Sequence, residues 1–149
     1  MVTIKQINEF IASEPVAMIG VSRDPKKFGY NAFRELKEKG MNVIPVNPNS
    51  QEINGAKVYP DIKSLPSGVK GLIIVTPAAV TASIAKEAKE AGFKQIWIQQ
   101  KSDSKEAVDI LSGSDINLIT GQCILMHYKP NSFHKFHAGL KKFFGMFPK

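Results

Sequence analysis

Residues 16–29 read Val16-Ala17-Met18-Ile19-Gly20-Val21-Ser22-Arg23-Asp24-Pro25-Lys26-Lys27-Phe28-Gly29. An apolar run ends at Gly20, a polar and basic loop follows, and a helix is expected from about Tyr30. In an α/β protein, a strand, a tight loop and a helix in this order commonly hold phosphate groups, because backbone N–H groups and the helix N-terminus point at the anion. The stretch therefore predicts a strand–loop–helix unit that binds a phosphorylated ligand, with an ordinary solvated turn as the alternative.

The loop matches neither of two common nucleotide-binding motifs. A dinucleotide fingerprint needs G-x-G-x-x-G, and Ser22 occupies its second glycine position. A P-loop needs G-x-x-x-x-G-K-[ST], whereas Gly29 is followed by Tyr30. The groups that remain are a glycine at the strand end, the Ser22 hydroxyl, Lys26, Lys27 and a second glycine, Gly29, and these suit a small phosphorylated ligand.

Length and composition are those of one globular domain, which we expect to span residues 1–149. No apolar stretch is long enough to span a bilayer, the N-terminus does not resemble a signal peptide, and Cys123 is the single cysteine, so we expect a cytoplasmic protein. The net charge of +7 favours an anionic partner, but the lysines are spread along the chain without interleaved aromatic residues. A small phosphorylated ligand is therefore expected, and nucleic acid is not.

Strand and helix patterns alternate along the chain. Apolar runs predict strands at Val16–Val21, Met41–Val46, Gly71–Val75, Gln95–Ile98 and Ile116–Thr120. Helical patterns occur at Val2–Ser13, Tyr30–Lys39, Pro77–Ala91 and Ser104–Leu111. The alternation predicts an α/β fold: a Rossmann-like three-layer sandwich with a mainly parallel five-stranded sheet in the order 3-2-1-4-5. Residues 131–147 predict an amphipathic C-terminal helix that covers the sheet or the partner in a homodimer, with a membrane-surface helix as the alternative.

Cap residues predict where several of these helices begin. Thr3 and Gln6 are spaced as a capping box for the first helix. Thr76 is expected to cap the third helix, and Ser102 or Asp103 the fourth.

Ligands of such sheets bind beyond the carboxyl ends of the strands, close to the point where the strand order reverses. The residues at those ends are Gly20, Val21, Ser22, Asn47, Pro48, Thr76, Pro77, Gln99, Gln100 and Cys123. An NAD-binding unit usually has an acidic residue at the end of the second strand, where this chain has Asn47. The missing acid disfavours NAD(P).

Several short segments occur in a familiar order. They are Gly20-Val21-Ser22-Arg23 with Lys27 and Gly29, Pro45-Val46-Asn47-Pro48, Thr76-Pro77, Ile96-Trp97-Ile98-Gln99, and Cys123. Over residues 13–128 the chain resembles the small stand-alone CoA-binding domain proteins, the bacterial YccU-like family, which are similar to the N-terminal domain of the succinyl-CoA synthetase alpha subunit. The resemblance implies a Rossmann-like fold that binds coenzyme A.

The resemblance also implies where the parts of coenzyme A would lie. The residues expected around the phosphates are Gly20, Ser22, Arg23 and Lys27; those expected near the adenosine or its 3′-phosphate are Asn47 and Pro48; and those expected along the pantetheine arm are Thr76 and Pro77. One departure concerns a glycine that the family tends to have shortly after Trp-x-Gln, where this chain has Gln99-Gln100-Lys101-Ser102. If that glycine lets a ligand approach the backbone, affinity or ligand identity will differ here.

Candidate catalytic groups are few. His127, His134 and His137 have no carboxylate or second cysteine at ligand spacing, so no metal site is predicted. Cys123 is either a small buried side chain or, if it faces the pocket, a group that could form a mixed disulfide with the thiol of coenzyme A. We therefore expect non-catalytic binding of coenzyme A or acyl-CoA, with an NAD(P)-binding enzyme or redox-sensing module as the alternative.

Overall fold

The structure is a computed structural model that describes residues 1–130. In chain order its elements are α1 (Ile4–Ile11), β1 (Val16–Ile19), α2 (Phe28–Glu38), β2 (Val43–Val46), β3 (Glu52–Ile53), β4 (Ala56–Lys57), β5 (Gly71–Ile74), α3 (Ala78–Glu90), β6 (Gln95–Gln99), α4 (Lys105–Leu111), β7 (Asn117–Gln122) and the short 3-10 helix η1 (Ile124–Met126). No helix of this described part is long and apolar enough to cross a membrane. The C-terminal helix expected over residues 131–147 lies outside the described residues, as do His134 and His137.

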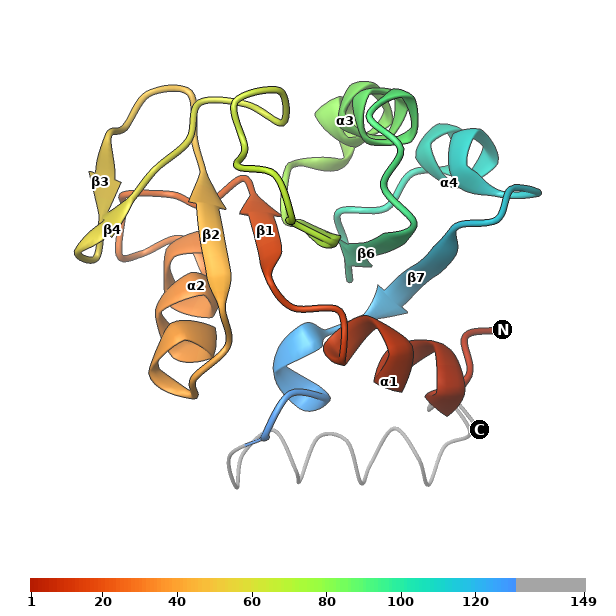
Figure 1. The fold of residues 1–149 in the computed structure, drawn as a ribbon, viewed down its shortest axis with the longest axis horizontal. Coiled ribbons are helices and arrows are strands. Elements are labelled where there is room, and N and C mark those ends of the chain that lie inside the picture. The colour runs from red at the N-terminus through yellow and green to blue at the C-terminus, as the bar shows by residue number, and fades with distance from the viewer. Residues whose placement is uncertain (131–149) are drawn as a thin grey trace.

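The described part of the chain contains one parallel five-stranded sheet. Its strands follow one another across the sheet in the order β2, β1, β5, β6 and β7 (Figure 1). On the free side of β2, Tyr59 makes a single parallel bridge to Val46. If only the five full strands are numbered along the chain, their spatial order is 2-1-3-4-5. If the Tyr59 segment is numbered as the third strand, the order is 3-2-1-4-5, as expected, and β7 follows as one more strand at the far edge. The α/β, Rossmann-like fold is therefore confirmed, and the winding reverses between β1 and β5.

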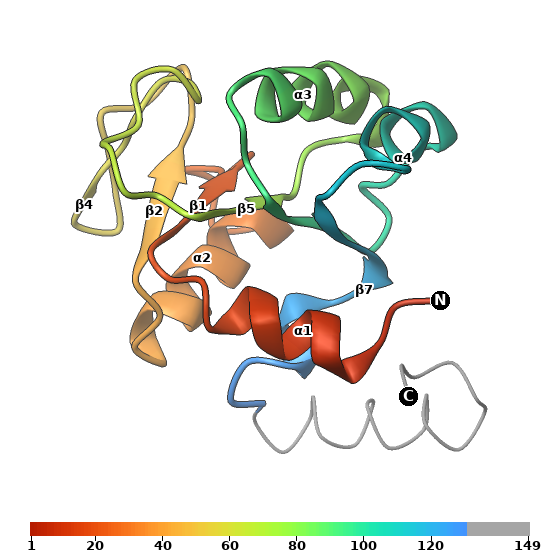
Figure 2. The same cartoon turned by 45° about the vertical axis from the view of Figure 1, so that its right-hand side comes forward.

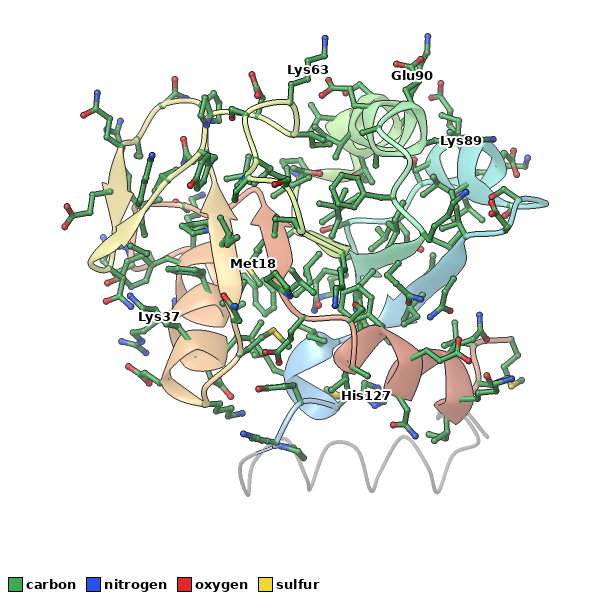
Figure 3. The ribbon with its side chains drawn as sticks, viewed as in Figure 1. Met18, Lys37, Lys63, Lys89, Glu90 and His127 are labelled. Carbon is green, nitrogen blue, oxygen red and sulfur yellow. The ribbon has the colours of Figure 1, made fainter. Side chains whose placement is uncertain are left out.

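Alternate side chains of the strands pack into separate cores on the two faces of the sheet. Met18 of β1 packs with Phe33 on the face that α1 and α2 cover. Ile19, the next residue, packs with Ala85 on the face that α3 and α4 cover, and Figure 2 shows these helix pairs on opposite sides of the sheet. All residues of β1 and β5 are buried, as expected of parallel strands covered on both faces. In Figure 3, Met18 lies inside the molecule whereas Lys63 projects outward.

The first helix begins as its sequence predicts, and the third does not. The capping box is confirmed, since Gln6 N donates to Thr3 Oγ1 at 3.2 Å and Thr3 N donates to Gln6 Oε1 at 3.0 Å. The expectation for the third helix was wrong: α3 begins at Ala78, and Pro77 is its N-cap with an extended ψ of 142°. The Thr76 hydroxyl is hydrogen bonded to the hydroxyl of Thr81 at 2.9 Å.

The fourth helix is also capped by a residue other than those expected. Ser104 is the N-cap of α4, and its Oγ accepts a hydrogen bond from Ala107 N at 3.2 Å. Ser102, expected as a cap, is buried beside the cavity described below, and Asp103 is exposed. The hydroxyl immediately before the helix is therefore the one that reaches its free N–H groups.

Candidate ligand-binding site

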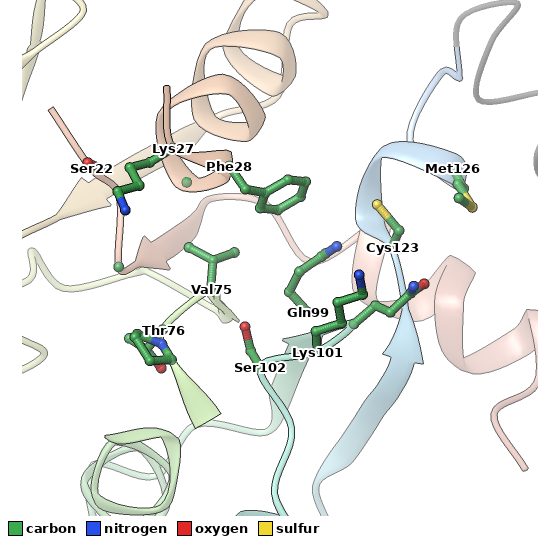
Figure 4. Close-up of a pocket in the computed structure, with 14 residues that line it drawn as sticks. Ser22, Lys27, Phe28, Val75, Thr76, Gln99, Lys101, Ser102, Cys123 and Met126 are labelled. Atoms are coloured by element: carbon green, nitrogen blue, oxygen red, sulfur yellow. The ribbon is translucent and has the colours of Figure 1, made fainter. Parts of the chain in front are cut away.

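A cavity opens at the carboxyl ends of β1, β5 and β6, where the strand order reverses. Its volume is about 650 Å³, and sites for small molecules span roughly 300–1,000 Å³. The residues that line it are Gly20, Ser22, Lys27, Phe28, Gly29, Val75, Thr76, Pro77, Gln99, Gln100, Lys101, Ser102, Cys123 and Met126 (Figure 4). The cavity thus lies where parallel α/β sheets bind their ligands.

Glycines bring the backbone segments of this site into close contact. Gly20 ends β1 with a φ of +93°, and a Cβ there would lie 3.0 Å from Thr76 N. A Cβ on Gly29 would lie 2.5 Å from the carbonyl oxygen of Gly20. The first turn of α2 therefore packs directly on the end of β1, which no larger residue would allow.

The N-terminus of α2 is suited to bind an anion. Lys27 is its N-cap and makes no hydrogen bond from its side chain to the helix, so the first N–H groups are left for a ligand. The preceding loop is held by its own polar groups, because Ser22 Oγ accepts from Asp24 N at 3.0 Å and Asp24 Oδ1 accepts from Lys26 N at 2.9 Å. The partial positive charge of the helix N-terminus and the Lys27 ammonium group both favour a phosphate here.

The end of β6 lines another part of the cavity with buried polar side chains. Gln99 is 4% exposed, and its Oε1 accepts a hydrogen bond from Ile124 N at 3.1 Å. Ser102 is 7% exposed, and Cys123 is 9% exposed. Figure 4 shows Cys123 and Met126 on the opposite side of the cavity from Ser22 and Lys27. The site therefore has one end formed by Lys27 and the start of α2, and a second end where buried polar and sulfur-containing side chains meet beside Lys101.

Where the family tends to have a glycine after Trp-x-Gln, this chain has Lys101 in a backbone conformation that glycine adopts easily. This residue has a φ of +74°, in the left-handed region that favours glycine. The chain keeps the backbone turn after Gln99 and places a lysine side chain beside the cavity. The turn also directs Ser102 inward, where Ser102 N donates to Gln99 O at 2.8 Å.

The residues expected from the sequence that line the cavity are Gly20, Ser22, Lys27, Gly29, Thr76, Pro77, Gln99, Gln100 and Cys123. Val21, Arg23, Asn47 and Pro48 do not line it. Asn47 connects the ends of two strands instead, since its Nδ2 donates to Val21 O at 2.7 Å and its Oδ1 accepts from Asn49 N at 2.7 Å. Arg23 Nη1 reaches Asn49 O at 3.5 Å. These polar residues shape the loops around the cavity.

Sequence reasoning missed other lining residues because no local pattern marks them. Phe28 lines the cavity from the first turn of α2 and is 46% exposed, which is known only from the folded structure. Ser102 was interpreted as a helix cap. Met126 comes from η1, which the tertiary fold brings back to the end of β6.

Comparisons with known proteins identify relatives of this chain. A family model described as a CoA binding domain matches residues 14–129. The alpha subunit of the ADP-forming acetate–CoA ligase II of Pyrococcus furiosus is 33% identical over 129 residues, which cover 79% of this chain and 28% of that subunit. The uncharacterized protein YneT of Bacillus subtilis is 24% identical over 112 residues, which cover 75% of this chain and 83% of YneT.

Solved structures show the same architecture. A conserved hypothetical protein from Pyrococcus furiosus has 39% identity and a TM-score of 0.70, with 74% of this chain and 95% of that chain covered. The chain spans under a third of the length of the acetate–CoA ligases that it matches, with 28%, 16% and 18% of their lengths covered. Because the family model matches most of its residues, this protein belongs to the family of CoA-binding domains.

Proposed function

We propose that this protein binds coenzyme A in the cavity at the carboxyl ends of β1, β5 and β6, and that it does so without catalysing a reaction. The observation that supports this most strongly is the junction of β1 and α2, where an uncapped helix N-terminus and Lys27 meet one end of the cavity. Coenzyme A joins a diphosphate to a long neutral arm that ends in a thiol. The helix N-terminus and Lys27 match the diphosphate, and the neutral arm would run across the cavity toward the β6 end, where Lys101 is the other cation of the described lining.

In this proposal the diphosphate lies over the first turn of α2. The N–H groups of Phe28 and Gly29 would donate to its oxygens, and Lys27 would neutralise part of its charge. The adenosine would extend past the cavity toward Asn47 and Pro48, which lie at the end of β2 next to the same loop.

The pantetheine arm would cross the ends of β5 and β6. Val75, Pro77 and Phe28 offer it apolar surface, and the Gly20–Thr76 approach leaves the backbone close to its path. The arm would end near Cys123 and Met126, on the side of the cavity away from Lys27 (Figure 4). Its thiol would then lie among sulfur-containing and apolar side chains.

The lining of the cavity supports binding rather than catalysis. Among the described residues, the side chains that line it include no carboxylate and no imidazole; its titratable groups are the amines of Lys27 and Lys101 and the thiol of Cys123. The relative from Pyrococcus furiosus is named as a subunit of an acetate–CoA ligase, and this chain spans 28% of it. We propose that the shared part is the portion that holds coenzyme A.

Isothermal titration with coenzyme A, NAD and NADP tests the proposal. We expect binding of coenzyme A alone, and at about 100 times its dissociation constant the ligand should stabilise the protein by roughly 2.7 kcal/mol. Lys27→Ala should weaken binding by about tenfold, because it removes one charge-assisted contact with phosphate. Lys26→Ala is the matched control, since Lys26 is an exposed neighbour that does not line the cavity.

Each outcome discriminates between ligands. If NAD or NADP binds and coenzyme A does not, the proposed ligand is wrong but the proposed location of the site still stands. Equal effects of the Lys27→Ala and Lys26→Ala substitutions would show that only the general charge of the loop matters, and would contradict the placement of the phosphates.

A further inference from the structure

Two hydrogen-bond donors at the β6 end belong to buried residues and are open to the cavity. Gln99 and Ser102 are 4% and 7% exposed, and both line the cavity. Gln99 Oε1 must be the atom that accepts the hydrogen bond from Ile124 N, because an amide NH₂ group cannot accept one. Among the described residues, neither Gln99 Nε2 nor Ser102 Oγ has a hydrogen-bond partner.

Neither atom is fully enclosed by protein, so water can satisfy both when no ligand is bound, and a ligand that displaces this water must offer an acceptor in its place. The bond to Ile124 N fixes the Gln99 amide in one orientation, with its NH₂ group as the free end. The left-handed turn at Lys101 places Ser102 in the lining of the same cavity as Gln99. In Figure 4, Gln99 lies between Val75 and Cys123 with Lys101 beside it, and Ser102 lies between Thr76 and Lys101. Two pre-positioned donors of this kind suit an oxygen atom that accepts two hydrogen bonds.

We infer that the ligand is an acyl thioester of coenzyme A and that its carbonyl oxygen accepts hydrogen bonds from Gln99 Nε2 and Ser102 Oγ. This inference rests on the proposed function, because it assigns the thiol end of the same ligand. A free thiol is a weak acceptor and leaves both donors unsatisfied, whereas a thioester carbonyl has two lone pairs. Phe28, Cys123 and Met126 add apolar or sulfur-containing surface that suits a short alkyl group on the carbonyl carbon.

The test compares ligands that differ only at this carbonyl. Coenzyme A, acetyl-CoA and S-ethyl-CoA, a thioether with CH₂ in place of C=O, are titrated calorimetrically into the wild-type protein. We expect acetyl-CoA to bind about tenfold more tightly than S-ethyl-CoA, because two neutral hydrogen bonds are made only by the thioester.

Substitutions assign the effect to the two donors. The Ser102 side chain makes no hydrogen bond within the described protein, so Ser102→Ala breaks none there. The substitution should weaken the binding of acetyl-CoA by about threefold to tenfold and leave the affinity for S-ethyl-CoA unchanged. Gln99→Glu keeps an oxygen that accepts from Ile124 N and replaces the NH₂ donor by an acceptor. It should therefore weaken the binding of acetyl-CoA more than Ser102→Ala does. Ser83→Ala, at an exposed position of α3, is the matched control and should change neither ligand.

The outcomes separate this inference from the proposed function. Equal affinities for acetyl-CoA and S-ethyl-CoA, or equal losses for both ligands in Ser102→Ala, would overturn the thioester site and leave coenzyme A binding intact. Failure of all three ligands to bind the wild-type protein would overturn the proposed function and this inference together.

Discussion

Replacing Gly29 with alanine tests the contact between α2 and the end of β1. In a helix, glycine to alanine normally stabilises a protein by about 0.5–1 kcal/mol, because alanine restricts the unfolded chain. Here the new Cβ would lie 2.5 Å from the carbonyl oxygen of Gly20, a backbone atom that cannot rotate away. Overpacking of a close-packed site costs about 1–3 kcal/mol. We therefore expect the sign to reverse, with a net loss of about 1–2 kcal/mol.

Urea denaturation measures this change in the free energy of unfolding. A thermal melt should show a drop of about 2–4 °C for each kcal/mol lost. The affinity for coenzyme A should fall as well, because the methyl group pushes the first turn of α2 away from the loop. Ser83→Ala introduces alanine at an exposed helical position and should stay within about 0.5 kcal/mol of wild type. A Gly29→Ala protein as stable as the wild type would refute this description of the junction.

Further predictions concern three other positions around the cavity. Asn47→Ala removes the bonds to Val21 O and from Asn49 N, so urea denaturation should show a loss of about 1–3 kcal/mol; an unchanged midpoint would mean that these bonds do not hold the loop. Lys101→Gly relieves a φ of +74° and should stabilise the protein by about 0.5–1 kcal/mol in the same assay; destabilisation would contradict the strain argument. Incubation with coenzyme A disulfide should add one CoA moiety to Cys123, whose thiolate attacks the disulfide and releases one molecule of coenzyme A. Intact-mass spectrometry measures the adduct, Cys123→Ser is the control, and an unmodified wild type would show that the thiol does not face the bound ligand.

The sequence predicts the sheet well because each central strand is buried on both faces. Such strands appear as continuous apolar runs, and β1 and β5 are buried throughout. The segment at Tyr59 is harder to predict, because a single bridge to Val46 requires no apolar run. Helix starts are predicted less well from the sequence, since the N-cap of α3 is Pro77 and that of α4 is Ser104.

Only part of the candidate site can be predicted from the sequence. The reason is that polar residues at strand ends can either line a cavity or bind the backbone of a neighbouring loop. Ser22 and Gln99 line the cavity, whereas Asn47 occupies the same kind of position and binds the backbone of a neighbouring loop. Local sequence does not distinguish these uses. Ser102 faces the cavity because the chain turns through a left-handed residue, and Lys101 gives no sign of that conformation in the sequence alone.

The central claim is that coenzyme A binds between the first turn of α2 and the end of β6. An NMR titration of ¹⁵N-labelled protein with coenzyme A tests it most directly, because each backbone amide reports its own surroundings. We predict that the amide signals of Gly20, Gly29 and Ser102 move together and saturate at one dissociation constant, while that of Gly113, which does not line the cavity, stays in place. Unchanged signals at Gly29 and Ser102 at saturating coenzyme A would contradict the claim.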